Sequence, residues 1–166
     1  MNATKETDFT ENDISITELK NIIKDITRNQ QVLSLKKQYQ HPGTSRYTHC
    51  LNVAIYTYTI CKKLGLDYIS ATRGAMLHDF YFYDWRAKER EGPKLHAFKH
   101  PRVALNNATN IFELNDIEKD VILKHMWPLT VILPKYKESY IITIVDKYCA
   151  TIEIIKYFKQ KYRTKR

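Results

Sequence analysis

Hydrophobic residues recur every three or four positions along most of the chain, and no segment shows the sustained alternation of a half-buried strand. The first of these patterns begins at Ile14 and predicts a helix, which Val32 and Leu35 either continue or follow with a second short helix. The His-Pro-Gly sequence at 41–43 then interrupts the chain. The pattern as a whole predicts an all-α fold, a compact multi-helix bundle.

Polar capping residues mark the start of the two central helices. Ser45 is a suitable N-cap for a helix that ends near residue 64, and Asp67 is a suitable N-cap for the next helix. The apolar run of this second helix ends in two adjacent polar residues, His78 and Asp79. Both side chains are good metal ligands, so the end of this helix is a candidate metal site.

The second half of the chain contains one irregular stretch and three further helices. Periodicity is lost over residues 80–99, which are aromatic at first and then mostly charged, and this predicts a loop over a site. Pro101 suits the first turn of the next helix. Asn115, with a glutamate three residues later, resembles a capping box that starts a helix ending at His125. A long final helix follows from about Tyr140.

The length of 166 residues suits one domain with its own core. We expect a flexible lead-in at residues 1–13, a single domain at residues 14–158 and a basic tail at residues 159–166. No apolar run approaches the roughly 20 residues that span a bilayer, and the polar N-terminus does not resemble a secretory signal. The three cysteines lack CxxC spacing and indicate reduced, mostly buried thiols, which predicts a cytoplasmic protein.

The net charge of +9 raises the question of a nucleic-acid partner. Six basic residues and no acid lie within residues 156–166, so much of the excess charge belongs to one end of the chain. Such a tail is usually solvated, and nucleic acid is a candidate partner only through it. The sequence leaves the oligomeric state open.

Six histidine and aspartate side chains are candidate metal ligands. They come from separate predicted helices or helix ends, so a bundle could bring them together. Histidine combined with carboxylate suits one or two divalent transition ions, with Fe or Mn expected first and Co, Ni, Zn or Mg as alternatives. Six ligands are about the number needed for two ions bridged by one carboxylate. The candidates are His49, His78, Asp79, His100, His125 and Asp146.

Most of the candidates also have a purely structural interpretation. The His78-Asp79 pair could simply end a helix, where a cation meets the helix dipole and the acid caps the next segment. His49 could be a core histidine, and Asp146 could lie on a solvated helix face. His96, four residues before His100, could take its place as a ligand or contact a substrate, and His41 is expected to be a turn residue.

The order His49, His78-Asp79, Asp146 resembles the H…HD…D signature of the HD-domain metal-dependent phosphohydrolase superfamily. The flanking sequences Ser-Arg-Tyr-Thr-His before residue 50, Leu-His-Asp at 77–79 and Ile-Val-Asp at 144–146 are also similar. His100 and His125 resemble the additional histidines of its two-metal branch. The similarity covers roughly residues 41–150 and is closest to short stand-alone bacterial HD-domain proteins.

The resemblance implies a role for each ligand. Asp79 would bridge two ions; His49, His78 and Asp146 would hold the first ion, and His100 with His125 the second. Arg46 lies one helical turn before His49 and is expected to act with Asp79 in catalysis, as a clamp for the substrate phosphate. Further candidate substrate contacts are Lys147, Lys124 and His96.

The function that the resemblance implies is hydrolysis of a phosphorylated small molecule, for example a nucleotide, by a phosphatase or phosphodiesterase. Some HD enzymes place a glutamate or lysine shortly after the HD pair, whereas residues 80–83 here are all aromatic and the nearest charge is Asp84. No general acid is therefore predicted, and the glycine-rich extension of cyclic-dinucleotide hydrolases is missing. Di-iron oxygenases of the superfamily share these ligand types, and a non-catalytic metal-bound sensor or RNA-associated module is a third interpretation.

Overall fold

Helices form almost all the regular structure of the residues that the computed structural model describes, which are residues 15–84 and 95–163. This confirms the predicted all-α fold. The lead-in predicted at residues 1–13 and half of the loop predicted over the site, residues 85–94, lie outside the described residues.

The N-terminal helical pattern is divided into short pieces. Residues 15–22 are helical. Further on, the Asn29 side chain accepts hydrogen bonds from two backbone N–H groups and begins a new helix. Val32 therefore belongs to a second short helix, which was one of the two alternatives predicted. A small antiparallel hairpin follows, which the sequence pattern did not predict; Gly43 turns it with φ 78°. The elements are α2 (Lys24–Arg28), α3 (Gln30–Ser34), the 3-10 helix η1 (Leu35–Lys37), β1 (Tyr39–His41) and β2 (Thr44–Ser45).

Three helices form the central layer: α4 (Arg46–Lys63), α5 (Tyr68–Leu77) and α8 (Lys137–Arg163). The predicted N-caps of the first two are confirmed. Ser45 Oγ accepts from Thr48 N at the start of α4, and Asp67 Oδ1 accepts from Ser70 N at the start of α5.

The remaining pair, α6 (His96–Thr109) and α7 (Asp116–Lys124), packs beside α5. The capping box at the start of α7 is confirmed, with Asn115 and Glu118 each bonded to the other's backbone N–H. The predicted start of α6 was wrong. The helix begins at His96, after Leu95 turns the chain with φ 62°, so Pro101 lies beyond its first turn. Because of this earlier start, His100 is carried by a helix rather than by a loop.

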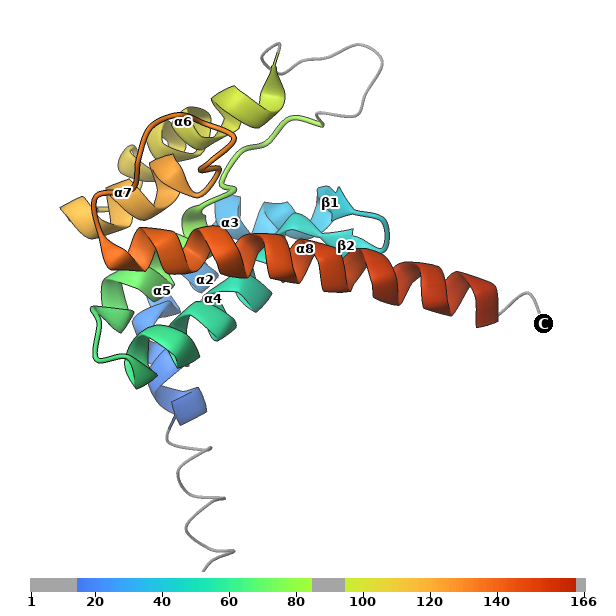
Figure 1. Cartoon of the computed structure of the whole chain (residues 1–166), viewed down its shortest axis with the longest axis horizontal. Helices are drawn as coiled ribbons and strands as arrows, with labels where there is room; N and C mark the ends of the chain where they lie inside the picture. Colours follow the sequence, from blue (N-terminus) through green and yellow to red (C-terminus); the bar gives the residue numbers. More distant parts are fainter. Residues whose placement is uncertain (1–14, 85–94, 164–166) are drawn as a thin grey trace, which may run out of the picture.

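The long helix α8 runs across the molecule, and its C-terminal end extends past the other elements (Figure 1). It contacts α4, α5 and α7. The part of the predicted basic tail that the structure describes, residues 159–163, continues this helix with exposed side chains. Among the described residues, no helix has the length and apolar character to cross a membrane.

The hydrophobic core is built from the N-terminal helical segments up to η1, from α4, α5, α6 and α7, and from the first half of α8. Cys50, Cys61 and Cys149 are buried and free, as predicted. The polar residues that directly follow α5 and α7 meet the middle of α8.

Candidate metal centre

The structure brings all six candidate ligands to one buried place. His49 comes from the first turn of α4, the His78-Asp79 pair follows the end of α5, and the other three come from α6, the end of α7 and the middle of α8. Their ligand atoms fall into overlapping groups in which all atoms lie within 4.8 Å of one another. These groups are His49 with His78 and Asp79; His78 with His125 and Asp146; and Asp79 with His100 and His125.

The first subsite consists of His49, His78 and Asp146, next to Asp79. His49 Nε2 lies 3.0 Å from Asp146 Oδ1, and His78 Nε2 lies 3.6 Å from the same oxygen. His78 Nε2 is also 3.5 Å from Asp79 Oδ2. Two imidazoles and two carboxylates therefore face a common point.

The second subsite consists of His100 and His125, on the other side of the Asp79 carboxylate. Asp79 Oδ1 lies 3.1 Å from His100 Nε2 and 3.7 Å from His125 Nε2. The Oδ2 atom of the same carboxylate faces His78 and accepts a hydrogen bond from the side-chain amide of Gln40. One oxygen of Asp79 thus faces each subsite, which is the arrangement that a bridging carboxylate requires.

Backbone carbonyls fix the orientation of three of the imidazoles. His78 Nδ1 lies 2.8 Å from Ala75 O, His125 Nδ1 lies 2.8 Å from Ile122 O, and His100 Nδ1 lies 3.0 Å from His96 O. A carbonyl oxygen can only accept, so each Nδ1 carries the proton. Each Nε2 then faces the centre and can offer a lone pair to an ion in place of any proton it carries, as a metal ligand must.

The donor set fits a cation. His78 Nε2 and Asp79 Oδ1 are buried and have no hydrogen-bond partner among the described residues. His100 Nε2 and His125 Nε2 are 2.8 Å apart, so their lone pairs repel unless a proton or a cation lies between them. Buried polar atoms without partners are costly, and an ion would satisfy them. Imidazole and carboxylate together favour a transition ion.

The protonation states of the metal-free centre differ between the two subsites. Burial opposes ionisation of Asp79, but the imidazoles of His78 and His100 hold the pKa of its carboxyl well below its usual range. Burial would lower the pKa of His49, but hydrogen bonds to Asp146 and Glu153 raise it to about 10. Burial and the charge of His78 lower the pKa of His125 to about 3. Burial would also lower the pKa of His78, but the charge of Asp79 raises it well above its usual range. An ion would therefore displace protons from His49 and His78 and find His125 already neutral.

A cavity of about 230 Å³ opens onto the centre, and two of the four predicted substrate contacts line it. Lys147 lines it from α8, with its Nζ 3.2 Å from His125 O and 3.1 Å from Thr143 O. His96 lines it from α6, with its ring stacked on His100 at a centroid distance of 4.6 Å. Lys124 does not line the cavity and forms an ion pair with Asp120.

Arg46 is fully buried and does not line the cavity. Its Nε donates to Gln40 Oε1 at 3.0 Å, its Nη1 donates to Tyr81 O at 2.7 Å, and its guanidinium stacks on the Tyr81 ring at 3.6 Å. The phosphate-binding role predicted for Arg46 stays a prediction. The contacts themselves connect α4 to β1 and to the segment after Asp79.

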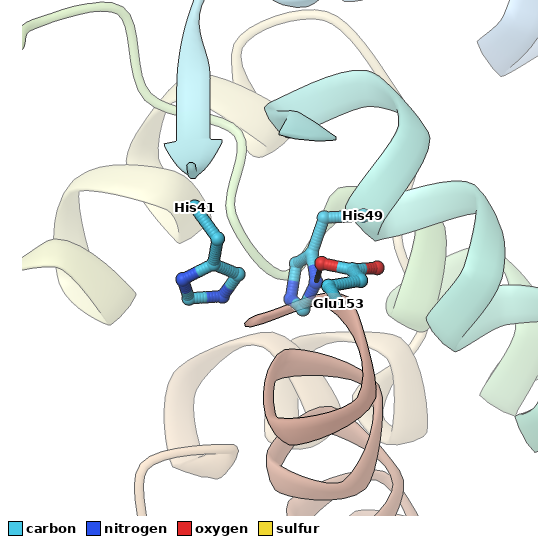
Figure 2. A group of neighbouring side chains, drawn as sticks. All are labelled: His41, His49 and Glu153. Carbon is cyan, nitrogen blue, oxygen red and sulfur yellow. Dashed lines mark hydrogen bonds and ion pairs between the residues drawn. The ribbon is translucent and has the colours of Figure 1, made fainter. Parts of the chain in front are cut away.

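Three residues of the site were missed as ligands or supports: Gln40, His41 and Glu153. His41 was expected in a turn, but it is the last residue of β1 and its ring meets His49 edge-on at 5.2 Å (Figure 2). Glu153 reaches His49 from α8. One available signal was that Glu153 is the only acid after Asp146, two helical turns further along the same face. The hairpin that carries Gln40 and His41 gave no comparable signal.

Comparison with known proteins agrees with this geometry. A model of the HD domain family matches residues 46–151, a range that contains all six candidate ligands. Searches of curated proteins and of solved structures found no match. The family match covers more than half of the chain, and its ends fall at the first residue of α4 and in the middle of α8. The chain therefore belongs to the HD domain family.

Proposed function

We propose that the protein is a metal-dependent phosphohydrolase that acts on a phosphorylated small molecule. The observation that carries the proposal is the position of the Asp79 carboxylate, with one oxygen toward each set of imidazoles, beside a cavity. His49, His78 and Asp146 would hold one ion with Asp79, and His100 with His125 would hold the second.

Ions bound in such a pair of subsites supply a water molecule of lowered pKa and neutralise charge on a phosphoryl oxygen. The residues of the chain supply orientation. Gln40 donates its amide to Asp79 Oδ2 and so leaves the other oxygen directed at His100. Lys147 uses two of its three ammonium protons on backbone carbonyls, which leaves one to donate to a phosphate oxygen in the cavity.

The size of the cavity supports a small phosphorylated substrate. Its volume of about 230 Å³ is smaller than the roughly 300–1,000 Å³ of pockets that enclose a whole drug-sized ligand. A phosphoryl group and the atoms next to it would be enclosed, and the rest of the substrate, for example a nucleoside, would lie outside. His96, stacked on His100 at the wall, would contact the part nearest the phosphoryl group.

The test begins with metal analysis of freshly purified protein. It continues with a phosphate-release screen over nucleotides and phosphorylated metabolites with Mn, Fe, Co, Ni and Mg. We expect Asp79→Asn to lose most of its bound metal and its phosphate release, because both subsites share this carboxylate. The exposed Asp116→Asn on α7 is the matched control and should keep both.

Two results would contradict the proposal. Normal metal content in Asp79→Asn would show that the ions bind elsewhere. Substrate-dependent oxygen uptake by the metal-loaded protein, without phosphate release, would identify an oxygenase that uses the same ligands.

A further inference from the structure

His49 is held differently from the other three imidazoles of the centre. Those of His78, His100 and His125 direct Nδ1 at neutral backbone carbonyls. His49 Nδ1 instead lies 3.0 Å from the carboxylate oxygen Oε2 of Glu153. Figure 2 shows this carboxylate beside the His49 ring, and the His41 ring approaches from another direction.

Glu153 is itself fixed in place. It is only 8% exposed, and its second oxygen, Oε1, accepts a hydrogen bond of 2.8 Å from the side-chain amide of Asn52. Asn52 and His49 lie three residues apart on α4, and Glu153 lies two turns after Asp146 on α8. The pairs His49–Asp146 and His49–Glu153 thus span the same two helices, with the imidazole between two carboxylates.

A carboxylate behind a ligand histidine changes the ligand. It holds the proton on Nδ1, keeps Nε2 directed at the ion, and increases the electron density that Nε2 donates; loss of such a partner typically costs about 10–100-fold in metal affinity. A carbonyl fixes the same tautomer without the negative charge. The first subsite therefore has one carboxylate-supported imidazole, whereas both imidazoles of the second subsite are supported by carbonyls.

We propose that Glu153 is a positioning residue for His49 and makes the His49–His78–Asp146 subsite bind its ion more tightly than the His100–His125 subsite. The inference rests on the proposed metal centre and ranks its two subsites by their affinity for the ion. The first ion is retained, and the second ion exchanges with the medium.

The experiment is a titration of the metal-free protein, as the whole chain, with Co²⁺ in the presence of a competing chelator. The visible absorption of the bound Co²⁺ measures how much ion the protein has taken up. The wild-type isotherm should show a tight phase and a weak phase. His125→Ala should remove the weak phase and leave the tight one, which assigns each phase to its subsite. Glu153→Gln keeps the shape of the side chain and removes its charge, and it should weaken the tight phase by about 10–100-fold while the weak phase changes little.

Glu138→Gln is the matched control. Glu138 is on the same helix, is 7% exposed, and accepts a hydrogen bond from Asp67 N away from the centre. It should leave both phases unchanged. Asn52→Ala, which frees Oε1 of Glu153, should weaken the tight phase less than Glu153→Gln does.

A purely structural role for Glu153 predicts a different set of results. Thermal unfolding of the metal-free variants would then change while the Co²⁺ isotherm stayed that of the wild type, and this outcome overturns the inference. Equal weakening of both phases in Glu153→Gln overturns it as well. A wild-type protein that binds no Co²⁺ would overturn the metal centre itself, and is distinguishable from both.

Discussion

Replacement of Gly74 by alanine tests whether the packing of α5 against α7 determines the geometry of the centre. A Cβ atom at Gly74 would lie 2.7 Å from Val121 Cγ1, 2.9 Å from Val121 Cβ and 3.3 Å from Glu118 Cα. Val121 is fully buried, and its β-branched side chain has few alternative rotamers. The Val121 side chain cannot relieve the clash by changing its rotamer, so α7 must move.

Two opposing contributions set the change in the free energy of unfolding. Inserting a methyl group into a closely packed interior typically costs about 1–3 kcal/mol. Alanine is better than glycine inside a helix by about 1 kcal/mol, which offsets part of this cost. We expect Gly74→Ala to lower the free energy of unfolding by about 1 kcal/mol, which corresponds to a fall in Tm of about 2–4 °C for a chain of this size.

The same displacement should affect one subsite more than the other. Helix α5 leads into Asp79 and α7 leads into His125, whose Nε2 lies 3.7 Å from Asp79 Oδ1. His49 and Asp146 are carried by α4 and α8 and do not depend directly on this contact. Gly74→Ala should therefore weaken the second Co²⁺ phase more than the first, in which only His78 and the shared Asp79 follow α5.

The assay is urea denaturation of the metal-free protein in a double-mutant cycle with Val121→Ala, combined with the Co²⁺ titration. Val121→Ala removes the atoms that clash with the new methyl group, so the double variant should be more stable than the sum of the two single changes predicts. Additive effects, or a Gly74→Ala protein as stable as the wild type, would refute the reasoning.

Two further predictions concern buried charged groups. Arg46→Ala should lower the free energy of unfolding by roughly 2–4 kcal/mol, because Gln40 Oε1 and Tyr81 O lose charged donors, and Arg46→Lys should not restore it. Urea denaturation measures this loss; a raised KM for a phosphorylated substrate with unchanged stability would instead support the phosphate clamp. Burial would raise the pKa of Asp120, but hydrogen bonds from Lys124 and Ser139 to its carboxylate lower that pKa. The ionised carboxylate therefore stabilises the fold at pH values above the ordinary aspartate pKa of about 4, and this stabilisation is lost as the pH falls below that value. The stability of Asp120→Asn should fall less than that of the wild type over that acidic range; parallel pH profiles would contradict the assignment.

The features that the sequence could predict depend on interactions within a few residues. The caps at Ser45, Asp67 and Asn115 are local hydrogen bonds between a side chain and a backbone N–H three residues later, so the residue type and spacing suffice. The six candidate ligands could also be selected from the sequence, because the resemblance to the HD family pattern indicates which residues recur on which helices.

The features that the sequence could not predict depend on contacts between distant segments. Nothing in the sequence near Leu95 indicates its positive φ, so the sequence favours Pro101 as the helix start instead. The position of Arg46 on α4 was foreseen, but the direction of its side chain is set by Tyr81 and Gln40, which come from other elements. The support of His49 by Glu153 joins residues 104 positions apart.

The two histidines that end α5 and α7 explain how a simple fold supplies oriented ligands. His78 and His125 are each the C-terminal cap of their helix, and each donates Nδ1–H to the carbonyl three residues earlier. Carbonyls in the last turn of a helix lack an intrahelical partner, so this bond satisfies a backbone group and selects the imidazole tautomer at once. Because α5 and α7 are in contact and end on the same side, both Nε2 atoms reach the two sides of Asp79. The closeness of the two helices at Gly74 and the orientation of the two ligands are thus consequences of one packing arrangement.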